Sequence, residues 1–265
     1  MSTGPEFNPK LLGIICNWCC YGGADLCGVS RFQYPPHIRL IRVMCSARVD
    51  LAHIFRAFSN GVDGVFIGGC HINDCHYITH GNYNALGMVK ICKKLLEHIG
   101  INPERLRLEW VSAGEGIRFA NIMNDFSPKI RKLGPLGKSE GMDKDRLKFK
   151  IEAATRLIPY IKLMQRGKLK DPVKLRASAE PEEAYNQFYS SDEFNRLFNK
   201  TIVDKLAISQ IMLLLQEKPL STGEISEKLG MNHSEVSEHM KSSSRRGLVR
   251  YDESRKCFAL AQVQI

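Results

Sequence analysis

The sequence predicts an α/β fold, with an open parallel sheet in the first half of the chain and a winged-helix-like unit at the end. Three observations support this fold class. Short apolar runs alternate with helical periodicity up to about residue 130, the stretch 133–142 (LGPLGKSEGM) breaks the alternation, and three helical segments followed by two strand-like segments close the chain.

Four short segments of the first half are expected to be buried parallel strands. They are Leu11 to Cys16, Arg39 to Cys45, Gly64 to Gly68 and Leu106 to Ser112. Each is short and consists mainly of apolar or β-branched residues, which is typical of strands covered on both faces. With helices between them, these strands predict a small flavodoxin-like sheet domain.

The segments between these strands have the periodicity of helices. Val49 to Asn60 and Asn84 to Ile99 carry apolar residues at helical spacing. A further helix is expected over Gly116 to Phe126, ending before Pro128. The segment after the first strand, which contains Cys19, is expected to be a loop.

The middle of the chain is expected to be a helical linker. A helix is predicted over Asp143 to Gln165, and Pro159 is expected to kink or interrupt it. Lys168 to Glu183 is charged and poor in apolar residues, which is typical of a solvated linker. The predicted domains are 1–139 for the α/β domain, 140–201 for the helical linker and 202–265 for the winged-helix-like domain.

The last domain has clear helix boundaries. A helix over Ile202 to Gln216 is followed by a capping box that begins at Ser221, and Gly230 ends the second helix. A third helix is expected over about Ser234 to Ser244. Two strand candidates, Leu248 to Tyr251 and Cys257 to Leu260, complete the outline of a winged helix.

Composition limits the classes of function. The chain has nine cysteines, no secretion signal and no apolar run long enough to span a bilayer, so we expect a cytoplasmic protein whose thiols are reduced. No glycine-rich phosphate-binding motif follows a predicted strand, so neither a nicotinamide nor a nucleoside triphosphate has a visible binding loop. We identify no catalytic residues.

The cysteines provide the strongest functional signal. Cys16 and Cys45 end the first two predicted strands, and Cys70 follows the third; Cys19 and Cys75 lie in the adjoining loops. The carboxyl ends of parallel strands share one edge of a sheet, so these thiols can converge there. Thiolates at such spacings resemble the ligands of a 2Fe-2S cluster, although a structural zinc site fits the same residues.

Other residues near this edge have alternative roles. His71, His76 and His80 flank the third cysteine loop and could replace a thiolate or form hydrogen bonds to the site. Cys92 and Cys257 are expected to be core residues. The pairs Gly22-Gly23 and Gly68-Gly69 are expected to permit unusual backbone conformations beside the cysteines.

Four motifs together resemble a known family. They are CNWCCYGGAD (16–25), RFQYPPHIRLIRVMCSARVD (31–50), DGVFIGGCHINDCHY (63–77) and PERLRLEWVSAGEG (103–116). The segment Leu11 to Lys132 resembles the delta subunit of methyl-viologen-reducing (F420-non-reducing) hydrogenase, an iron-sulfur protein. Ala47 and the pair Ile72-Asn73 depart from the family pattern, which more often has glycine and Pro-Gly there.

The resemblance implies a cofactor and its ligands. It points to one 2Fe-2S cluster held by four of five cysteines, with Cys20 and Cys27 as non-ligands. The five candidate metal ligands are Cys16, Cys19, Cys45, Cys70 and Cys75.

The resemblance also implies partners. Electrons would pass from a hydrogenase or formate dehydrogenase subunit to the flavin subunit of heterodisulfide reductase, within a large hetero-oligomeric complex that performs electron bifurcation in methanogenesis. The chain would then be an electron-transfer subunit in an anaerobic cytoplasm, with no complete active site of its own.

The resemblance does not extend to the winged-helix-like extension. A winged helix suggests DNA binding, which requires a strongly basic surface. Residues 202–265 carry nine Lys and Arg against eight Asp and Glu, and Glu235 and Glu238 lie on the expected recognition helix. We therefore expect a docking or dimerisation module and no nucleic-acid partner; the alternative is a redox-sensing, metal-binding transcription regulator.

Overall fold

Four parallel strands form the centre of the first domain. They are β1 (Leu11–Cys16), β2 (Ile38–Val43), β3 (Gly64–Gly69) and β4 (Leu106–Trp110), hydrogen-bonded in the order β2-β1-β3-β4. The computed structural model describes residues 7–78, 80–169 and 173–261. The strand order is that of a flavodoxin-like sheet, so the predicted fold class is confirmed.

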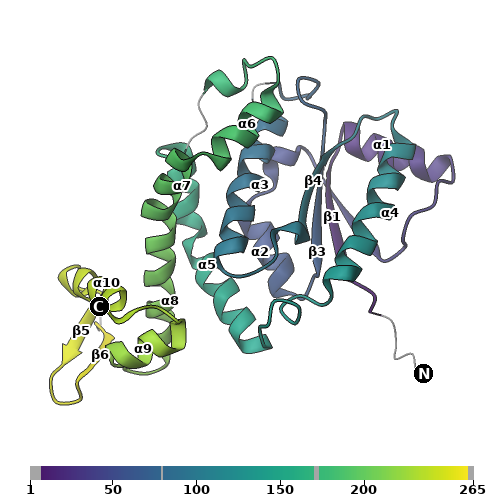
Figure 1. Cartoon of the computed structure of the whole chain (residues 1–265). Coiled ribbons are helices and arrows are strands. Elements are labelled where there is room, and N and C mark those ends of the chain that lie inside the picture. Colours follow the sequence, from purple (N-terminus) through teal and green to yellow (C-terminus); the bar gives the residue numbers. More distant parts are fainter. Residues whose placement is uncertain (1–6, 79, 170–172, 262–265) are drawn as a thin grey trace, which may run out of the picture.

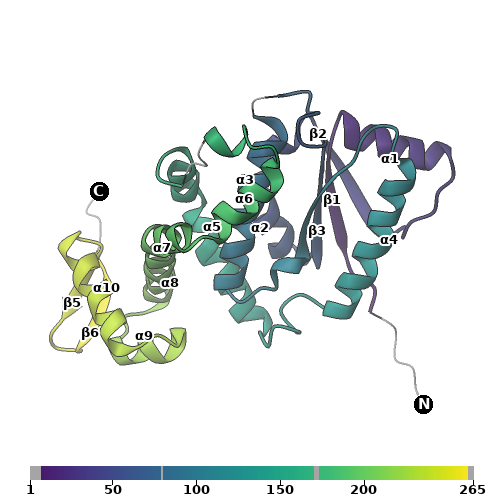
Figure 2. The same ribbon diagram turned by 45° about the horizontal axis from the view of Figure 1, so that its top comes forward.

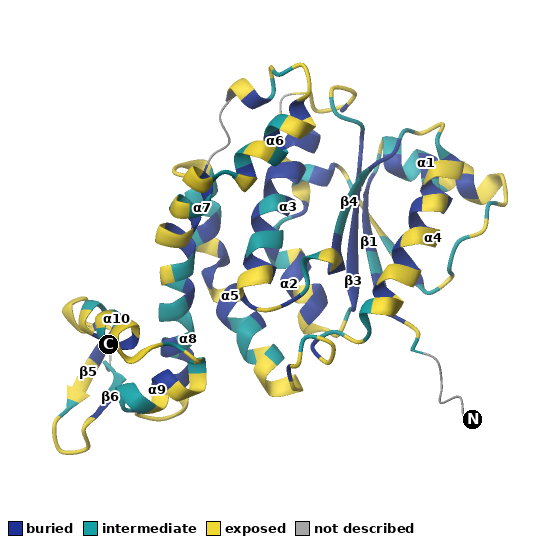
Figure 3. Cartoon of the chain, viewed as in Figure 1, coloured by how far each residue is buried: buried dark blue, intermediate teal, exposed yellow. Residues whose placement is uncertain are grey.

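Helices cover both faces of this sheet. α1 (Cys19–Val29) and α4 (Gly116–Leu133) lie on one face, and α2 (Leu51–Ser59) and α3 (Gly81–His98) on the other (Figures 1 and 2). Every residue of β3 is buried, as Figure 3 shows by its dark blue colour. The apolar strand sequence is therefore explained by burial on both faces.

The helix α1 stands where the sequence analysis expected a loop. Glycines in this segment lower its helix propensity. Gly22 and Gly23 nevertheless lie in the helix without a positive φ, so the prediction of an unusual backbone conformation at these two glycines is wrong. Their role is close packing, because a Cβ atom at Gly23 would lie 2.8 Å from the Ser112 carbonyl oxygen. Tertiary contact thus overrides the local preference.

Two helices continue through a proline. α4 extends to Leu133, so the predicted end before Pro128 is wrong. Pro128 and Asn124, whose carbonyl loses its helical partner, are both exposed, and water can satisfy that carbonyl. Pro159 likewise lies inside the continuous helix α5 (Lys144–Arg166).

The segment after the sheet domain forms a second helical layer. It contains α5, α6 (Pro181–Ser190), α7 (Asp192–Phe198), a π-helical turn (Asn199–Val203) and α8 (Asp204–Glu217). α5 packs on α2 and α6 packs on α3, so one hydrophobic core continues from the sheet into this layer. The predicted division at residues 139 and 201 stays a prediction. Of the predicted solvated segment Lys168 to Glu183, residues 170–172 lie outside the described residues; Leu169, Leu175 and Pro181 are buried, and most of the other described residues are exposed.

The chain ends in a compact winged-helix unit. α8 is followed by α9 (Thr222–Leu229), α10 (His233–Arg245) and the antiparallel strands β5 (Val249–Asp252) and β6 (Cys257–Leu260). This unit has its own hydrophobic core and lies far from α1 and α4 (Figure 1). None of the helices in the described segments is both long and apolar enough to cross a membrane.

A buried ion pair joins the start of β4 to the segment that follows α4. Arg105, immediately before β4, is fully buried, and its Nε donates to Glu140 at 2.6 Å. Its Nη1 donates to the carbonyls of Asp63 and Gly134 at 3.0 Å, and Nη2 donates to Ser139 Oγ at 2.7 Å. These bonds fix the segment that connects the sheet domain to α5.

We expect Arg105→Met to lower the free energy of unfolding by about 3–5 kcal/mol, because it leaves the buried Glu140 carboxylate without its cation. The measurement is chemical denaturation of the purified chain. Arg107→Met is the matched control, since Arg107 pairs with the partly exposed Glu109 and should cost no more than about 1 kcal/mol. Equal stability of Arg105→Met and the unmodified chain would contradict the expectation.

Candidate metal centre

The parallel sheet brings three cysteines to one edge. Cys16 is the last residue of β1 and pairs in register with Val43, the last residue of β2, two residues before Cys45. Cys70 directly follows β3, which pairs with β1 on its other side. The strand ends therefore gather these three residues, while their role as metal ligands stays a prediction.

The thiols lie in two neighbouring pairs, which are joined by an interaction between the Cys70 and Cys75 side chains. The sulfur atoms of Cys16 and Cys70 lie 3.8 Å apart. Cys45 and Cys75 interact through their side chains, and both sulfurs lie near the position that a Cβ atom at Gly81 would take, at 3.5 Å and 2.2 Å. The glycine at the start of α3 therefore leaves space for the second pair.

Two further thiols lie close to these pairs. The Cys19 side chain is partly exposed and interacts with Cys70, so all five predicted cysteines meet in one region. Cys20 is fully buried next to them, with its sulfur 2.3 Å from the Cβ position of Gly68. Gly68 has no positive φ, and its absent side chain makes room for this sulfur.

The remaining cysteines lie elsewhere. Cys27 donates a hydrogen bond to the Phe32 carbonyl, Cys92 is buried on α3, and Cys257 is buried in the winged-helix unit. These positions agree with the expected core roles of Cys92 and Cys257.

Backbone N–H groups surround the sulfurs. The Cys20 N–H donates to Cys16 Sγ at 3.4 Å, and the Tyr77 and Asn82 N–H groups point at Cys75. These donors belong to or adjoin the first turns of α1 and α3, where N–H groups have no partner within the helix. Donation to sulfur favours the thiolate and would stabilise a metal–thiolate centre.

Burial and the interactions among the thiols determine their protonation. Burial raises the pKa of Cys19 to about 12 and also raises the pKa of Cys45 and Cys75. The hydrogen bond between Cys16 and Cys70 lowers the pKa of Cys16 and raises that of Cys70. A cation that binds here must displace these protons, so the group of thiols requires positive charge to become thiolates.

Side chains around the third cysteine loop hold it in place. Asn82 is fully buried, and its Nδ2 donates to the carbonyls of Cys70 at 3.1 Å and His71 at 2.6 Å. Asn73 adopts φ +67°, a left-handed conformation that asparagine tolerates well, and accepts a bond from Tyr83. Asparagine thus suits this turn without the help of a glycine. No local sequence pattern pointed to Asn82.

The histidines have other partners. His71 contacts Glu115 at 2.7 Å, and the His76 ring stacks on Trp18 at 4.0 Å. His80 immediately precedes α3. The structure therefore gives His71 and His76 positioning roles beside the thiols.

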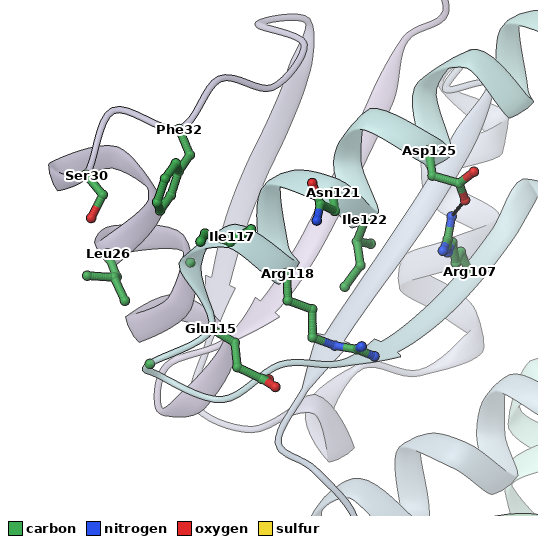
Figure 4. Close-up of a pocket in the computed structure, with 12 residues that line it drawn as sticks. Leu26, Ser30, Phe32, Arg107, Glu115, Ile117, Arg118, Asn121, Ile122 and Asp125 are labelled. Atoms are coloured by element: carbon green, nitrogen blue, oxygen red, sulfur yellow. Dashed lines mark hydrogen bonds and ion pairs between the residues drawn. The ribbon is translucent and has the colours of Figure 1, made fainter.

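A separate surface cavity of about 830 Å³ adjoins this region (Figure 4). Leu26, Phe32 and Ile117 form its apolar part, between α1 and α4. Glu115 also lines it, and the same carboxylate accepts from the Ser112 N–H at 2.7 Å while contacting His71. Glu115 thus connects the start of α4 to the cysteine loop.

The donor set fits a thiolate-bound metal centre. Tetrahedral metal–thiolate bonds of about 2.3 Å place neighbouring sulfurs about 3.8 Å apart, the separation found between Cys16 and Cys70. Within the described ranges, no three His, Cys, Asp or Glu side chains converge closely enough to hold a single metal ion.

Comparisons with known proteins agree with the sheet domain. A family profile described as "Methyl-viologen-reducing hydrogenase, delta subunit" matches residues 11–134. A second profile, "Bacterial regulatory protein, arsR family", matches residues 209–251 in the winged-helix unit.

Individual relatives match the same half of the chain. An iron-sulfur subunit of F420-non-reducing hydrogenase from Archaeoglobus profundus is 52% identical over 130 residues, which are 49% of this chain and 94% of the relative. The vhc iron-sulfur subunit of the same kind of hydrogenase from Methanococcus voltae is 51% identical over 139 residues, 52% of this chain and 96% of the relative.

A third relative carries this domain within a longer polypeptide. It is a subunit of the ferredoxin/F(420)H(2)-dependent CoB-CoM heterodisulfide reductase from Methanosarcina acetivorans, 46% identical over 129 residues, which are 49% of this chain but 16% of the relative. The first two relatives, in contrast, are matched along nearly their whole length, and the family profile spans the segment that carries all five thiols. The chain therefore belongs to the family of the methyl-viologen-reducing hydrogenase delta subunit.

Proposed function

We propose that this chain is an electron-transfer subunit in which four cysteines hold a 2Fe-2S cluster. The observation that carries the proposal is the pair arrangement: Cys16 with Cys70, and Cys45 with Cys75, at one edge of the sheet. Each of these four thiols is buried, at 7% exposure or less. Cys19 is more exposed than these four cysteines, and it interacts with Cys70, which already contacts Cys16. We therefore assign Cys19 an auxiliary role.

The spread of the thiols also favours a binuclear centre over a structural zinc site, because no three of the described His, Cys, Asp or Glu side chains converge on one point. Four-coordinate zinc requires its ligands around one atom, whereas each iron of a 2Fe-2S centre needs two protein ligands. Such a cluster supplies one-electron oxidation and reduction. The buried thiols and the N–H donors of α1 and α3 keep water away and stabilise negative charge on sulfur.

An exposed apolar rim supports contact with partner proteins. Trp18, Met44, Tyr77 and Ile78 are large, exposed apolar residues, and each lies within three residues of a candidate ligand. Exposed apolar side chains gathered around a site are typical of protein interfaces. This rim would allow a redox partner to approach the thiol edge closely.

The relatives supply the identity of the partners in this proposal. Their names describe iron-sulfur subunits of a hydrogenase and a subunit of heterodisulfide reductase. We infer that electrons come from a hydrogenase or formate dehydrogenase subunit, then pass to the flavin-bearing heterodisulfide reductase subunit. The chain would then work in a large cytoplasmic complex that couples methanogenesis to electron bifurcation.

Anaerobic purification of the full chain tests the cofactor directly. We expect two iron and two sulfide ions per chain, visible absorption that bleaches on reduction, and an EPR signal from one unpaired electron in the reduced state. Copurification with hydrogenase, formate dehydrogenase or reductase subunits would support the electron-transfer role. A colourless protein with stoichiometric zinc would remove the proposal.

Single Cys→Ser substitutions test the ligand assignment. We expect Cys16→Ser, Cys45→Ser, Cys70→Ser and Cys75→Ser each to lose or strongly alter the visible and EPR spectra, because each removes a thiolate ligand. Cys19→Ser should retain an intact 2Fe-2S spectrum. Cys257→Ser is the matched control, since this buried thiol lies in the winged-helix unit. Loss of the cluster in Cys19→Ser would show that the pairing is wrong.

A second candidate function is a redox-sensing transcription regulator. The match of residues 209–251 to a bacterial regulatory family favours it, and Lys241, Arg245 and Arg246 are exposed at the end of α10. Against it, Glu235 and Glu238 are exposed on the same helix. These carboxylates would repel the phosphate backbone near the part of the helix that reads bases.

Fluorescence anisotropy with duplex DNA separates the two candidates. We expect only weak affinity, with a Kd of about 10⁻⁴ M or weaker at physiological salt, because the domain is nearly neutral. The paired variant Lys241→Gln/Arg245→Gln should then behave like the unmodified chain. Binding below about 10⁻⁷ M that weakens steeply with salt and is lost in the variant would make the regulator the better assignment.

A further inference from the structure

A cavity of about 780 Å³ lies between the sheet domain and the helical layer. Its walls come from the 3-10 turn Ser46–Arg48, the starts of α2 and α3, the end of α5, and α6. A volume of this size is typical of small-molecule sites. Six of its fifteen lining residues lie beyond residue 134, outside the family match, so the cavity depends on the helical layer.

The cavity is strongly cationic. Arg48, Lys162, Arg166 and Arg176 line it, whereas Asp50 is the one carboxylate among its lining residues that the structure describes. Both oxygens of Asp50 are engaged, Oδ2 by Lys162 at 2.6 Å and Oδ1 by the Ala52 N–H at 2.8 Å. Asp50 therefore offsets only part of the positive charge.

Two of these guanidinium groups stand out. In the described parts of the chain, neither Arg48 nor Arg166 forms an ion pair or a side-chain hydrogen bond. Arg166 lies one helical turn after Lys162, so both side chains are on the same face of α5. Arg48, at the end of the 3-10 turn, lines the cavity as well, and both arginines are exposed.

Another part of the wall is apolar, although His80, Asn84 and Gln165 also line the cavity. Met88, Ile91 and Tyr189 line the cavity and are buried from solvent. A cationic rim beside an apolar wall suits a ligand with an anionic group and an organic body. Planar guanidinium groups bind phosphoryl oxygens in a bidentate manner, which favours phosphate over a simple inorganic monoanion.

We propose that this cavity binds a small phosphorylated molecule, with Arg48 and Arg166 contacting its phosphoryl oxygens. The site adjoins the thiol edge, because the Arg48 backbone N–H donates to the Cys45 carbonyl at 2.9 Å and His80, also in the wall, directly precedes Gly81. If the proposed cluster is present, a bound anion would make its reduction less favourable through the added negative charge. Binding itself does not depend on the proposed function.

Isothermal titration of the full chain with inorganic pyrophosphate, and then with ADP, tests the site. We expect saturable one-to-one binding, weakened at least about tenfold in Arg48→Gln and in Arg166→Gln, because each loses a charge-assisted hydrogen bond. Arg146→Gln is the matched control, since it removes the same charge from the exposed first turn of α5. Tighter binding of ADP than of pyrophosphate would show that the apolar wall contributes.

Three outcomes would overturn the proposal. They are no binding, equal affinity in all three variants, or complete loss of pyrophosphate binding when sodium chloride is added to the ionic strength of the pyrophosphate solution. A cavity that binds only an acidic peptide and not pyrophosphate would assign it to a protein partner instead. The titration is run on both metal-free and iron-loaded chain. Binding to a chain that never acquires iron would separate this site from the electron-transfer proposal.

Discussion

Parallel pairing of β2, β1 and β3 in register is the constraint on which the metal centre depends. Cys16 and Cys70 are 54 residues apart in the chain, and their sulfurs approach to 3.8 Å because the two strands that precede them are neighbours. A slip of one residue in either pairing would turn a cysteine to the other face of the sheet. The strands therefore do more than form a core, since their register sets which sulfurs can meet.

Two glycines leave the space that the neighbouring sulfurs occupy. A Cβ atom at Gly68 would collide with Cys20, and one at Gly81 would collide with Cys75. Burial at this edge raises the pKa of most of the thiols, and the N–H groups at the starts of α1 and α3 oppose it. The balance favours protonated thiols in the absence of a cation and thiolates in its presence.

The second half of the chain changes the surroundings of this centre without supplying any of the candidate ligands. Its helical layer extends the core of the sheet domain, through contacts such as Tyr185 with Tyr83 and Phe198 with His98. The same packing forms the cationic cavity beside Cys45. α7, the π-helical turn and α8 then follow one another directly and connect this layer to the winged-helix unit.

Local signals were sufficient to predict the strands, most helices, the capping box at Ser221 and the gathering of Cys16, Cys45 and Cys70, because periodicity, capping residues and strand ends are visible in short stretches of sequence. Long-range packing was needed to establish that α1 is a helix, that Pro128 is tolerated and that the helices of 140–201 pack on the sheet domain. The pairing of thiols and the position of Asn82 likewise depend on contacts between distant segments. Such contacts override local propensity, and they cannot be predicted from any short stretch of sequence.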